Sequence, residues 1–556
     1  MKKRLLALAL YGSTAAIAQV SGPLVSNPAM MAMSESLAVI ASSGRATSFE
    51  VREFRPSRSH EIQKATDSSA RFSTQLTTQI AAVPANTPYT QTATYQPLGA
   101  PISVNFEAQG VGTPGFTVSG APPDTTLGVS PTQIVQWVNT QIAVYDKAGN
   151  ALLPAPGFIN GNQIWAALPA GAVCRQFNRG DPLVQYDRLA RRWILSQFAF
   201  NNTFTSNAQC IAVSTTDNAL GSYALYEFNF GNLLPDYGKL GVWPDAYYIT
   251  YNMFANGSTF AGGRACAYDR AAMIAGQSAV QICFNSTSRF SFLPSDLDGT
   301  TLPPSGAPNY HISWNWAFLA SAPYTMQLTK FKPDFVTPAN STFDDGFGGA
   351  AFSFVGFDLG AGTLAACNDT GDACVPQPGT NQRLDTLGSR HMYRLVYRNF
   401  GGYDALLVTQ ATDNVTANTA ELRWWEIRRP GANPPVVYQN STFRPDSTAR
   451  WMGSAAFDKL GNIGIGYSVS SAAINPGIRI AGRRVTDPKN LLRAEATVIA
   501  GTGSQTTSRS RWGDYSTMQI DPVNECTFWY TTQYIGANGT FNWRTRIAAF
   551  KFPNCN

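Results

Sequence analysis

"RWGDYSTMQIDPVNECTFWYTTQY", residues 511–534, decides the fold, because an earlier part of the chain follows the same plan. The stretch "RWMGSAAFDKLGNIGIGYSVSS", residues 450–471, also opens with Arg-Trp and runs through small or polar residues to an Asp. Both then pass a short turn and continue into alternating apolar residues. Strand-like alternation that repeats about sixty residues later indicates an array of similar β units.

Five further stretches carry looser copies of the plan, and they begin at residues 122, 180, 241, 309 and 389. The residues that mark the seven openings are Asp124, Asp181, Asp245, Tyr310, His391, Met452 and Asp514. A period near sixty that is built from short strands is typical of a propeller. We therefore predict an all-β chain that folds as a seven-bladed β-propeller; a pair of β-sandwich domains is the alternative.

Two details of this repeat can be tested against a structure. The last unit is about one strand too short, so "ISVNFEAQG", residues 102–110, is predicted to supply its outer strand and to close the last blade. Aromatic-Asp or apolar-Asp pairs place Asp187, Asp458 and Asp521 at the tips of hairpins, where an Asp side chain can bond the backbone two residues on.

Composition agrees with many short strands joined by turns. Charged residues make up 14% and aromatic residues 12% of the 556 residues, and Gly (47) and Pro (34) are plentiful. The formal net charge of +6 is spread along the chain without a Lys/Arg block, so nucleic-acid binding is not expected. No stretch after the N-terminus is long and apolar enough to predict a membrane span.

The N-terminus has the features of an export signal. "MKKRLLALALYGSTAAIAQ" combines a positive start, a short apolar stretch and the small-residue site Ala16-Ile17-Ala18. We predict a signal peptide at 1–18, a low-complexity arm or linker at 19–100 with a short helix within 29–43, and a propeller domain at 101–556. The protein is accordingly expected to be secreted or periplasmic.

Eight cysteines in an exported chain favour disulfides. Pairing between neighbours along the chain predicts the bonds Cys174–Cys210, Cys266–Cys283, Cys367–Cys374 and Cys526–Cys555. A cysteine metal site has little support, because no CxxC motif occurs.

The long motifs also resemble a known group of proteins. "PPDTTLGVSPTQIVQWVN", "GDPLVQYDRLARRWILSQF", "LGVWPDAYY", "LPSDLDGTTLPP" and "RWGDYSTMQIDPVNECTFWYT" are similar to a family of large, mostly uncharacterised secreted bacterial proteins. The resemblance extends from about residue 100 to residue 556. It implies export and a β-rich repeat fold, and it implies no activity.

A propeller gathers its blade openings around one central funnel, which is a common place for a site. The carboxylates expected at the funnel are Asp124, Asp181, Asp245 and Asp514. They could act as acid and base on a glycosidic bond, hold Ca²⁺, or cap backbone groups of the inner strands. Two histidines of the openings could assist proton transfer or be buried spacers; these are His311 and His391.

Arginines and aromatic residues accompany them. Arg390, Arg450 and Arg511 suit recognition of a carboxylate or sulfate, or they pair with neighbouring Asp residues. The aromatic residues would stack on sugar rings or pack between blades; these are Trp243, Trp451, Trp512, Tyr310 and Tyr515. Asp296 and Asp298, followed by Gly299, resemble the start of a calcium loop but fit a plain turn better.

The sequence contains no GxSxG elbow, HExxH motif, P-loop or CxxCH motif. Standard serine hydrolases, zinc proteases, nucleotide-binding enzymes and cytochromes with covalent haem are therefore excluded. The first hypothesis is a secreted carbohydrate-active enzyme, a hydrolase or lyase that acts on an acidic polysaccharide at the funnel. The second is a secreted binding or adhesion module without catalysis. No cofactor is required by either hypothesis, and Ca²⁺ is the one that a ring of carboxylates would hold.

Overall fold

The computed structural model describes residues 22–43, 89–116, 118, 122–287, 289–314, 326–344, 353–354, 374–388, 390–414, 419–430, 435–506 and 510–556. Strands make up 52% and helices 6%, so the predicted β class is confirmed. The predicted signal peptide, residues 1–18, lies outside the described residues.

The described strands group into seven consecutive antiparallel units. Unit 1 contains β5 (Thr126–Val129), β6 (Gln133–Val138), β7 (Gln141–Asp146) and β8 (Phe158–Asn160). Unit 2 contains β9 (Leu183–Asp187), β10 (Arg192–Phe200), β11 (Asn207–Ser214) and β12 (Tyr223–Gly231). Unit 3 contains β13 (Leu233–Val242), β14 (Ala246–Ala255), β15 (Thr259–Asp269) and β16 (Gln281–Ser286).

Units 4 and 5 share one sheet, because β17 and β24 pair in parallel through residues 295–298 and 395–398. Unit 4 contains β17 (Leu293–Asp298), β18 (Asn309–Trp314), β19 (Met326–Lys332), β20 (Thr342–Asp344) and β21 (Ser353–Phe354). Unit 5 contains β24 (His391–Asn399), β25 (Asp404–Asn414), β26 (Thr419–Arg428) and β27 (Val436–Phe443). A separate hairpin consists of β22 (Val375–Gln377) and β23 (Thr380–Leu384).

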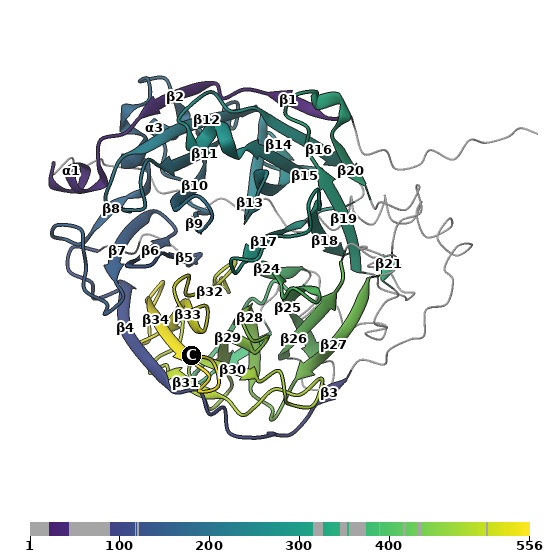
Figure 1. Cartoon of the computed structure of the whole chain (residues 1–556). Coiled ribbons are helices and arrows are strands. Elements are labelled where there is room, and N and C mark those ends of the chain that lie inside the picture. The colour runs from purple at the N-terminus through teal and green to yellow at the C-terminus, as the bar shows by residue number, and fades with distance from the viewer. Residues whose placement is uncertain are drawn as a thin grey trace, which may run out of the picture.

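Unit 6 contains β28 (Ala449–Phe457), β29 (Ile463–Ser470), β30 (Gly477–Arg483) and β31 (Ala496–Ile499). Unit 7 contains β32 (Thr517–Ile520), β33 (Thr527–Ile535), β34 (Trp543–Lys551) and, on its outer edge, β4 (Ile102–Gly110). Figure 1 shows the units side by side around a common centre, with the first strand of each unit nearest to that centre.

The pairing of β4 with β34 is the arrangement predicted for residues 102–110. The two strands are antiparallel, with Phe106 opposite Ile547 and Val104 opposite Ala549. The alternating exposure along the first part of β4 fits a strand with one face on the core and one in water.

Packing between units uses glycines as contact points. A Cβ atom on Gly466 of β29 would lie 2.4 Å from the Tyr530 ring, and one on Gly464 would lie 2.7 Å from the Phe528 ring. The two aromatic side chains of β33 therefore rest directly on the backbone of β29. The opposite face of β29 carries Ile463 and Tyr467, which are also buried.

The predicted Asp hairpin tips are confirmed. The Oδ1 atom of Asp187 accepts from the backbone N–H groups of Leu189 (3.0 Å) and Ala190 (3.1 Å). Asp458 accepts from Leu460 at 2.9 Å, and Asp521 accepts from Val523 at 2.9 Å. Each carboxylate therefore bonds the backbone two residues on, as an Asx turn requires.

Two of the seven predicted openings belong to second strands of their units and not to first strands. Asp245 lies between β13 and β14, and Tyr310 lies within β18. The first strand of unit 3 is β13, whose sequence "LLPDYGKLGV" contains Pro235 and a register shift between Asp236 and Lys239. This interruption removes the alternation by which the other openings are recognised.

The arm predicted at 19–100 contributes strands to the outer edges of several units. β1 (Leu24–Ser26) pairs with β16, β2 (Met30–Met33) pairs with β12, and β3 (Thr90–Gln91) pairs in parallel with β27. The helix predicted within 29–43 occupies only its second half, as α1 (Leu37–Ser42), because Ser36 caps the helix by accepting from Val39. Figure 1 shows these purple segments on the periphery.

The remaining helices are short and lie in connections. They are η1 (Gly161–Ala167), α3 (Val173–Gln176), α4 (Arg270–Ile274) and η2 (Pro338–Asn340). Among the helices of the described segments, none is both long and apolar enough to cross a bilayer.

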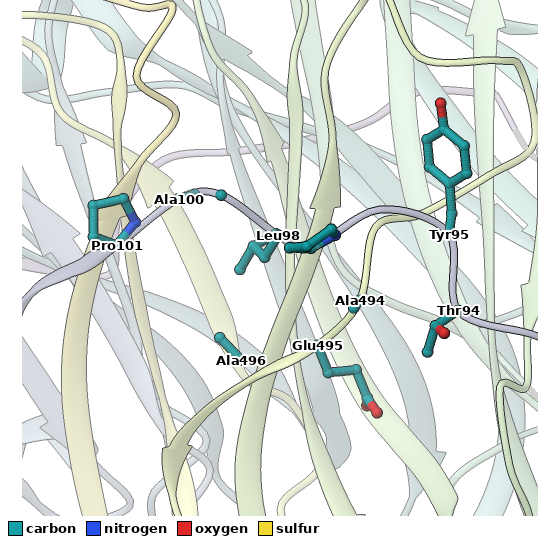
Figure 2. Close-up of a pocket in the computed structure, with 10 residues that line it drawn as sticks. Thr94, Tyr95, Leu98, Ala100, Pro101, Ala494, Glu495 and Ala496 are labelled. Carbon is teal, nitrogen blue, oxygen red and sulfur yellow. The ribbon is translucent and has the colours of Figure 1, made fainter.

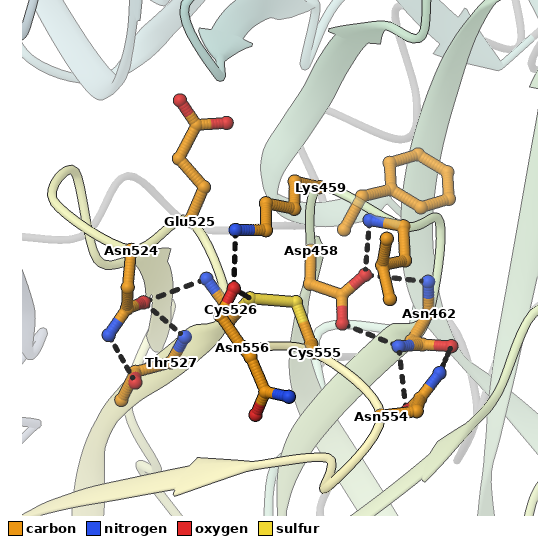
Figure 3. The surroundings of a disulfide bond; sticks show 12 residues. Asp458, Lys459, Asn462, Asn524, Glu525, Cys526, Thr527, Asn554, Cys555 and Asn556 are labelled. Carbon is orange, nitrogen blue, oxygen red and sulfur yellow. Dashed lines mark hydrogen bonds between the residues drawn. A yellow bond between two sulfur atoms is a disulfide. The ribbon is translucent and has the colours of Figure 1, made fainter.

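Three of the four predicted disulfides are present: Cys174–Cys210, Cys266–Cys283 and Cys526–Cys555. The fourth involves Cys367, which lies outside the described residues. Figure 3 shows how the Cys526–Cys555 bond holds the last residues against the β28–β29 turn, where the Lys459 Nζ atom donates to the Asn556 carbonyl at 2.5 Å. Three disulfides are consistent with an oxidising, extracytoplasmic compartment.

Candidate functional site

Several predicted site residues meet at the centre of the molecule, at the ends where the first strands of the units begin. We call this group the central cluster. It consists of Asp124, Asp181, Lys239, Arg390, Arg511 and Asp514, together with the rings of Tyr237 and Tyr515. These residues come from units 1, 2, 3 and 7 and from the segment before β24.

The backbone positions the carboxylates at the cluster. Asp124 (φ 46°) and Asp181 (φ 47°) both adopt the left-handed conformation two residues before β5 and β9 begin. Asp tolerates this conformation better than most residues. Tyr237 (φ 55°) and Met452 (φ 54°) adopt it within β13 and β28.

Lys239 lies among the three carboxylates and is 1% exposed. Its Nζ atom donates to the carbonyl of Gly238 at 2.8 Å and lies 3.3 Å from the ring centroid of Tyr237 and 4.5 Å from that of Tyr515. Burial lowers the pKa of Lys239 to about 7, although the nearby carboxylates of Asp181 and Asp514 oppose this shift.

Asp124 joins the first unit to the last. Its Oδ1 atom accepts from the backbone N–H of Asp514 at 2.9 Å. Burial raises the pKa of Asp124 well above its usual value, and repulsion from Asp514 and Asp181 adds to the effect. Asp124 therefore holds a proton more readily than an exposed aspartate does.

The two arginines of the cluster differ in exposure. Arg511 pairs with Asp514 at 3.3 Å, and both side chains are partly exposed. Arg390 is buried, and its guanidinium lies 4.7 Å from the ring centroid of Tyr237. Tyr515 is held in place by a 2.7 Å bond from its hydroxyl to the carbonyl of Pro182.

A second buried network lies next to the cluster along the same first strands. Arg394 of β24 donates from Nε to Asp296 at 2.5 Å and from Nη2 to Asp298 at 2.7 Å. Gln185 donates to Asp296 at 2.7 Å and accepts from Gln519 at 2.8 Å. Asp296 and Asp298 thus both pair with Arg394. They lie in strand β17 and do not form a calcium loop.

Asp245, a predicted catalytic residue, lies apart from the cluster. It occupies the turn between β13 and β14 and accepts from the hydroxyl of Tyr248 at 3.1 Å. Burial raises its pKa to about 6. The charged neighbour that acts on it is Arg270, which pairs with Asp187.

The two candidate histidines are buried among aromatic rings. His311 packs against Tyr248, Phe331 and Phe343, and His391 packs against Trp425. Burial lowers the pKa of each imidazole to about 3. Both histidines are therefore neutral at pH 7.

Arg450 is buried and belongs to an ion-pair network separate from the cluster. Its guanidinium donates to Glu495 at 2.8 and 2.7 Å and to Asp446 at 2.9 Å. Glu495 lines a groove of about 660 Å³ between residues 94–101 and 494–496, which Figure 2 shows. The groove is lined by Thr94, Tyr95, Pro97, Leu98, Gly99, Ala100, Pro101, Ala494, Glu495 and Ala496, so it does not include the predicted site residues.

The predicted sugar-stacking aromatic residues are all buried. The rings of Trp451 and Trp512 lie 5.3 Å apart between units 6 and 7. Trp243 packs 4.7 Å from Tyr397 and 6.2 Å from Tyr310. Their contacts are therefore those of packing between units.

The described residues contain no group of three or more His, Cys, Asp or Glu side chains arranged to hold a metal ion. At the central cluster, the nitrogen of Lys239 already lies among the three carboxylates, where a metal ion would otherwise bind. Sequence reasoning missed Lys239, because it lies in the irregular strand β13. The signal that points to it is a lysine between two glycines, "GKLG" preceded by Tyr237, in a stretch otherwise without basic residues.

Comparisons with known proteins find only distant structural likenesses. No family model and no curated protein matches the sequence. The chain is similar to an α-L-arabinanase of Penicillium chrysogenum complexed with arabinobiose, at 8% identity over 82% of this chain and 99% of that one, with a TM-score of 0.33.

Two further solved structures are similar to a comparable degree. They are a protein of unknown function from Dyadobacter fermentans (8% identity, 82% of this chain and 99% of that one, TM-score 0.34) and the polysaccharide lyase Uly1 (8% identity, 65% and 88%, TM-score 0.30). TM-scores this low define neither a fold nor an activity.

Proposed function

We propose that the chain is an exported seven-bladed β-propeller, with a signal peptide at 1–18, an arm at 19–100 and the propeller at 101–556. The seven antiparallel units around one centre and the pairing of β4 with β34 support this fold. Contacts between units 1 and 7 add support: Lys147 pairs with Asp521 at 2.6 Å, and Gln136 donates to Thr531 at 2.9 Å.

We further propose that the protein is a carbohydrate-active enzyme that acts on an acidic polysaccharide at the central cluster. One observation carries this proposal: three carboxylates, Asp124, Asp181 and Asp514, converge with Arg390 and Arg511 at one place. A carboxyl group whose pKa is raised beside further carboxylates, as for Asp124, suits acid–base chemistry. Guanidinium groups suit the acid group of a charged sugar.

The test is a screen of the mature protein against neutral and acidic polysaccharides. New reducing ends and the ultraviolet absorbance of a new carbon–carbon double bond are followed together, with added Ca²⁺ and with chelator. We expect products from an acidic polymer and none from its neutral counterpart. Asp514→Asn should lower the rate about 100-fold or more while thermal unfolding stays unchanged. Asp217→Asn, on the exposed side chain that pairs with Arg191, is the matched control.

Burial of the cluster favours a second candidate, a binding module without catalysis. Asp124 and Asp514 are 3% and 7% exposed, so these two carboxylates are largely covered. This candidate predicts retention of the protein on an acidic polymer in a pull-down without any product. It also predicts the same retention for Asp514→Asn as for the wild-type protein.

A further inference from the structure

A group of basic side chains lies in units 5 and 6, at the strand ends that point away from the central cluster. We call it the basic patch, and it consists of Arg428, Arg429, Arg483, Arg484, Lys489 and Arg493. The strands β26 and β30 run parallel to the first strands of their units, because each lies two antiparallel pairings away. The central cluster lies where the first strands begin, so the patch at the last residues of β26 and β30 lies at the opposite end.

The basic patch carries an excess of positive charge. With the carboxylates beside it in the sequence and the fold, it occupies residues 403–404, 426–430 and 483–493. These residues contain six cations and three carboxylates, so their net charge is +3, half of the +6 of the whole chain. Two of the carboxylates form pairs at 2.6 Å, Glu426 with Arg428 and Asp487 with Arg493. The excess charge therefore belongs to the other cations of the patch.

Three of these cations are available to a ligand. Arg429 and Lys489 are exposed, and Arg484 is partly exposed. In the part of the chain that the structure describes, no carboxylate lies within 4.0 Å of the charged groups of these three side chains. Guanidinium and ammonium groups without an internal partner suit carboxylate or sulfate groups of another molecule.

Neutral rings hold two cations of the patch close together. The guanidinium of Arg428 lies 3.3 Å from the ring centroid of Tyr438, and the Nζ atom of Lys489 lies 3.7 Å from the same centroid. The ring of Tyr403 lies 3.9 Å from the Arg428 guanidinium. An aromatic ring attracts a cation without neutralising its charge, so Lys489 is held in place and still attracts an anion.

The loop that carries Arg484 and Lys489 is fixed to its neighbours. Asn490 accepts from the backbone N–H of Asn440 at 3.0 Å, and its own N–H donates to the Gln439 side chain at 3.2 Å. A Cβ atom on Gly99 would lie 3.5 Å from the Nη2 atom of Arg484. Because Gly99 lines the groove of about 660 Å³ described above, the patch borders a groove that an extended chain could follow.

We propose that the basic patch is a binding site for an acidic polysaccharide, separate from the central cluster. The excess charge is complementary to a polymer that carries carboxylate or sulfate groups. The three disulfides fit an extracytoplasmic compartment, which favours a polysaccharide over a nucleic acid as the polyanion. This site goes beyond the function proposed above and binds its polymer whether or not the central cluster is catalytic.

The experiment measures dissociation constants for a polymer of uronic acid, a sulfated polysaccharide, a neutral polysaccharide and a DNA duplex. One variant combines Arg429→Gln, Arg484→Gln and Lys489→Gln. We expect it to bind the acidic polysaccharides about tenfold or more weakly than the wild-type protein, with the thermal unfolding midpoint retained. The matched control removes the same charge at three exposed residues outside the patch and should bind like the wild type; it combines Arg175→Gln, Arg191→Gln and Lys332→Gln.

A single change covers the case in which the triple variant does not fold. Lys489→Glu reverses a charge at an exposed position and should also weaken binding to the acidic polysaccharides. Tighter binding of the uronic acid polymer or of the sulfated one supports the site and identifies its acid group.

Equal losses in the patch variant and the control would overturn the site, as would unchanged binding in a folded patch variant. Tighter binding of the DNA duplex than of either acidic polysaccharide, or no binding of any polyanion, would overturn it too. The enzyme proposal fails separately: binding that depends on the patch, without product on any polymer, would overturn that proposal and leave this inference standing.

Discussion

At the scale of single residues, burial decides which ionisable groups can act. His311 and Lys239 are both buried bases, and burial lowers the pKa of both. The imidazole lies among aromatic rings and stays neutral throughout the physiological range, whereas the amine lies among carboxylates that keep its pKa near 7. The charge of the surroundings thus separates a packing residue from a member of the central cluster.

His311→Phe should make the protein more resistant to acid. The pKa of His311 is about 3 in the folded protein and about 6.5 in an unfolded chain. The unfolded chain therefore binds the extra proton, so stability is full above pH 6.5 and falls as the pH is lowered toward 3. At pH 4 this costs about 3 kcal/mol. Thermal unfolding from pH 7 to pH 4 should show a smaller loss for the variant than for the wild-type protein, while Thr497→Ala, an exposed change, should follow the wild type.

Arg394→Met should destabilise the protein by about 3–5 kcal/mol, because it leaves the carboxylates of Asp296 and Asp298 buried without their cation. Denaturant unfolding measures the loss. The matched control is Arg191→Met, which breaks an exposed pair with Asp217 and should change the midpoint little. Equal effects of the two changes would mean that the central ion pair adds nothing beyond a surface pair.

At the scale of elements, strand β13 explains why part of the site escaped prediction. Its register shift at residues 236–239 turns Lys239 into the interior, and a Cβ atom on Gly241 would lie 2.5 Å from the carbonyl oxygen of Ser295 in β17. Close approach of two first strands therefore selects small and irregular residues. Such residues carry no periodic signal, although they line the centre.

Gly466→Ala tests the close packing of units 6 and 7. The new methyl group would lie 2.4 Å from the Tyr530 ring, so the ring or the strand must move. We expect a loss of about 1–3 kcal/mol in denaturant unfolding. Gly402→Ala, where a Cβ atom meets nothing within 4 Å, is the control and should be close to neutral.

At the scale of the whole molecule, strands far apart in sequence complete each other. β4 covers the outer edge of β34, and β1, β2 and β3 pair with the outer strands of units 3, 2 and 5. An outer strand without such a partner exposes a row of backbone donors and acceptors to other chains. The N-terminal segments thus protect the sheets that follow them in sequence.

A chain that begins at Gly112 should associate or unfold at a lower temperature than one that begins at Pro101. Both lack β1, β2, α1 and β3, but only the second keeps β4. The difference between them isolates the edge of β34. Size-exclusion chromatography and thermal unfolding report it, and two identical profiles would show that β4 is dispensable.

Sequence alone determined the features that are local or repeated. The alternation of apolar residues, the Asp turns at 187, 458 and 521, the three neighbouring disulfides and the outer strand at 102–110 all follow from short-range patterns or from the repeat length. Asp124, Asp181, Asp514, Arg390 and Arg511 were among the predicted site residues for the same reason, because they precede first strands.

Tertiary structure decided which of those residues meet. Asp245, His311, His391 and Arg450 fit the same sequence plan, yet they lie in a distal turn, in aromatic packing or in a separate ion-pair network. Lys239 fits no plan and lies at the centre. The physical reason is that a repeat fixes the position of a strand, whereas the surroundings of a side chain depend on contacts from other units, which the periodicity of one unit does not contain.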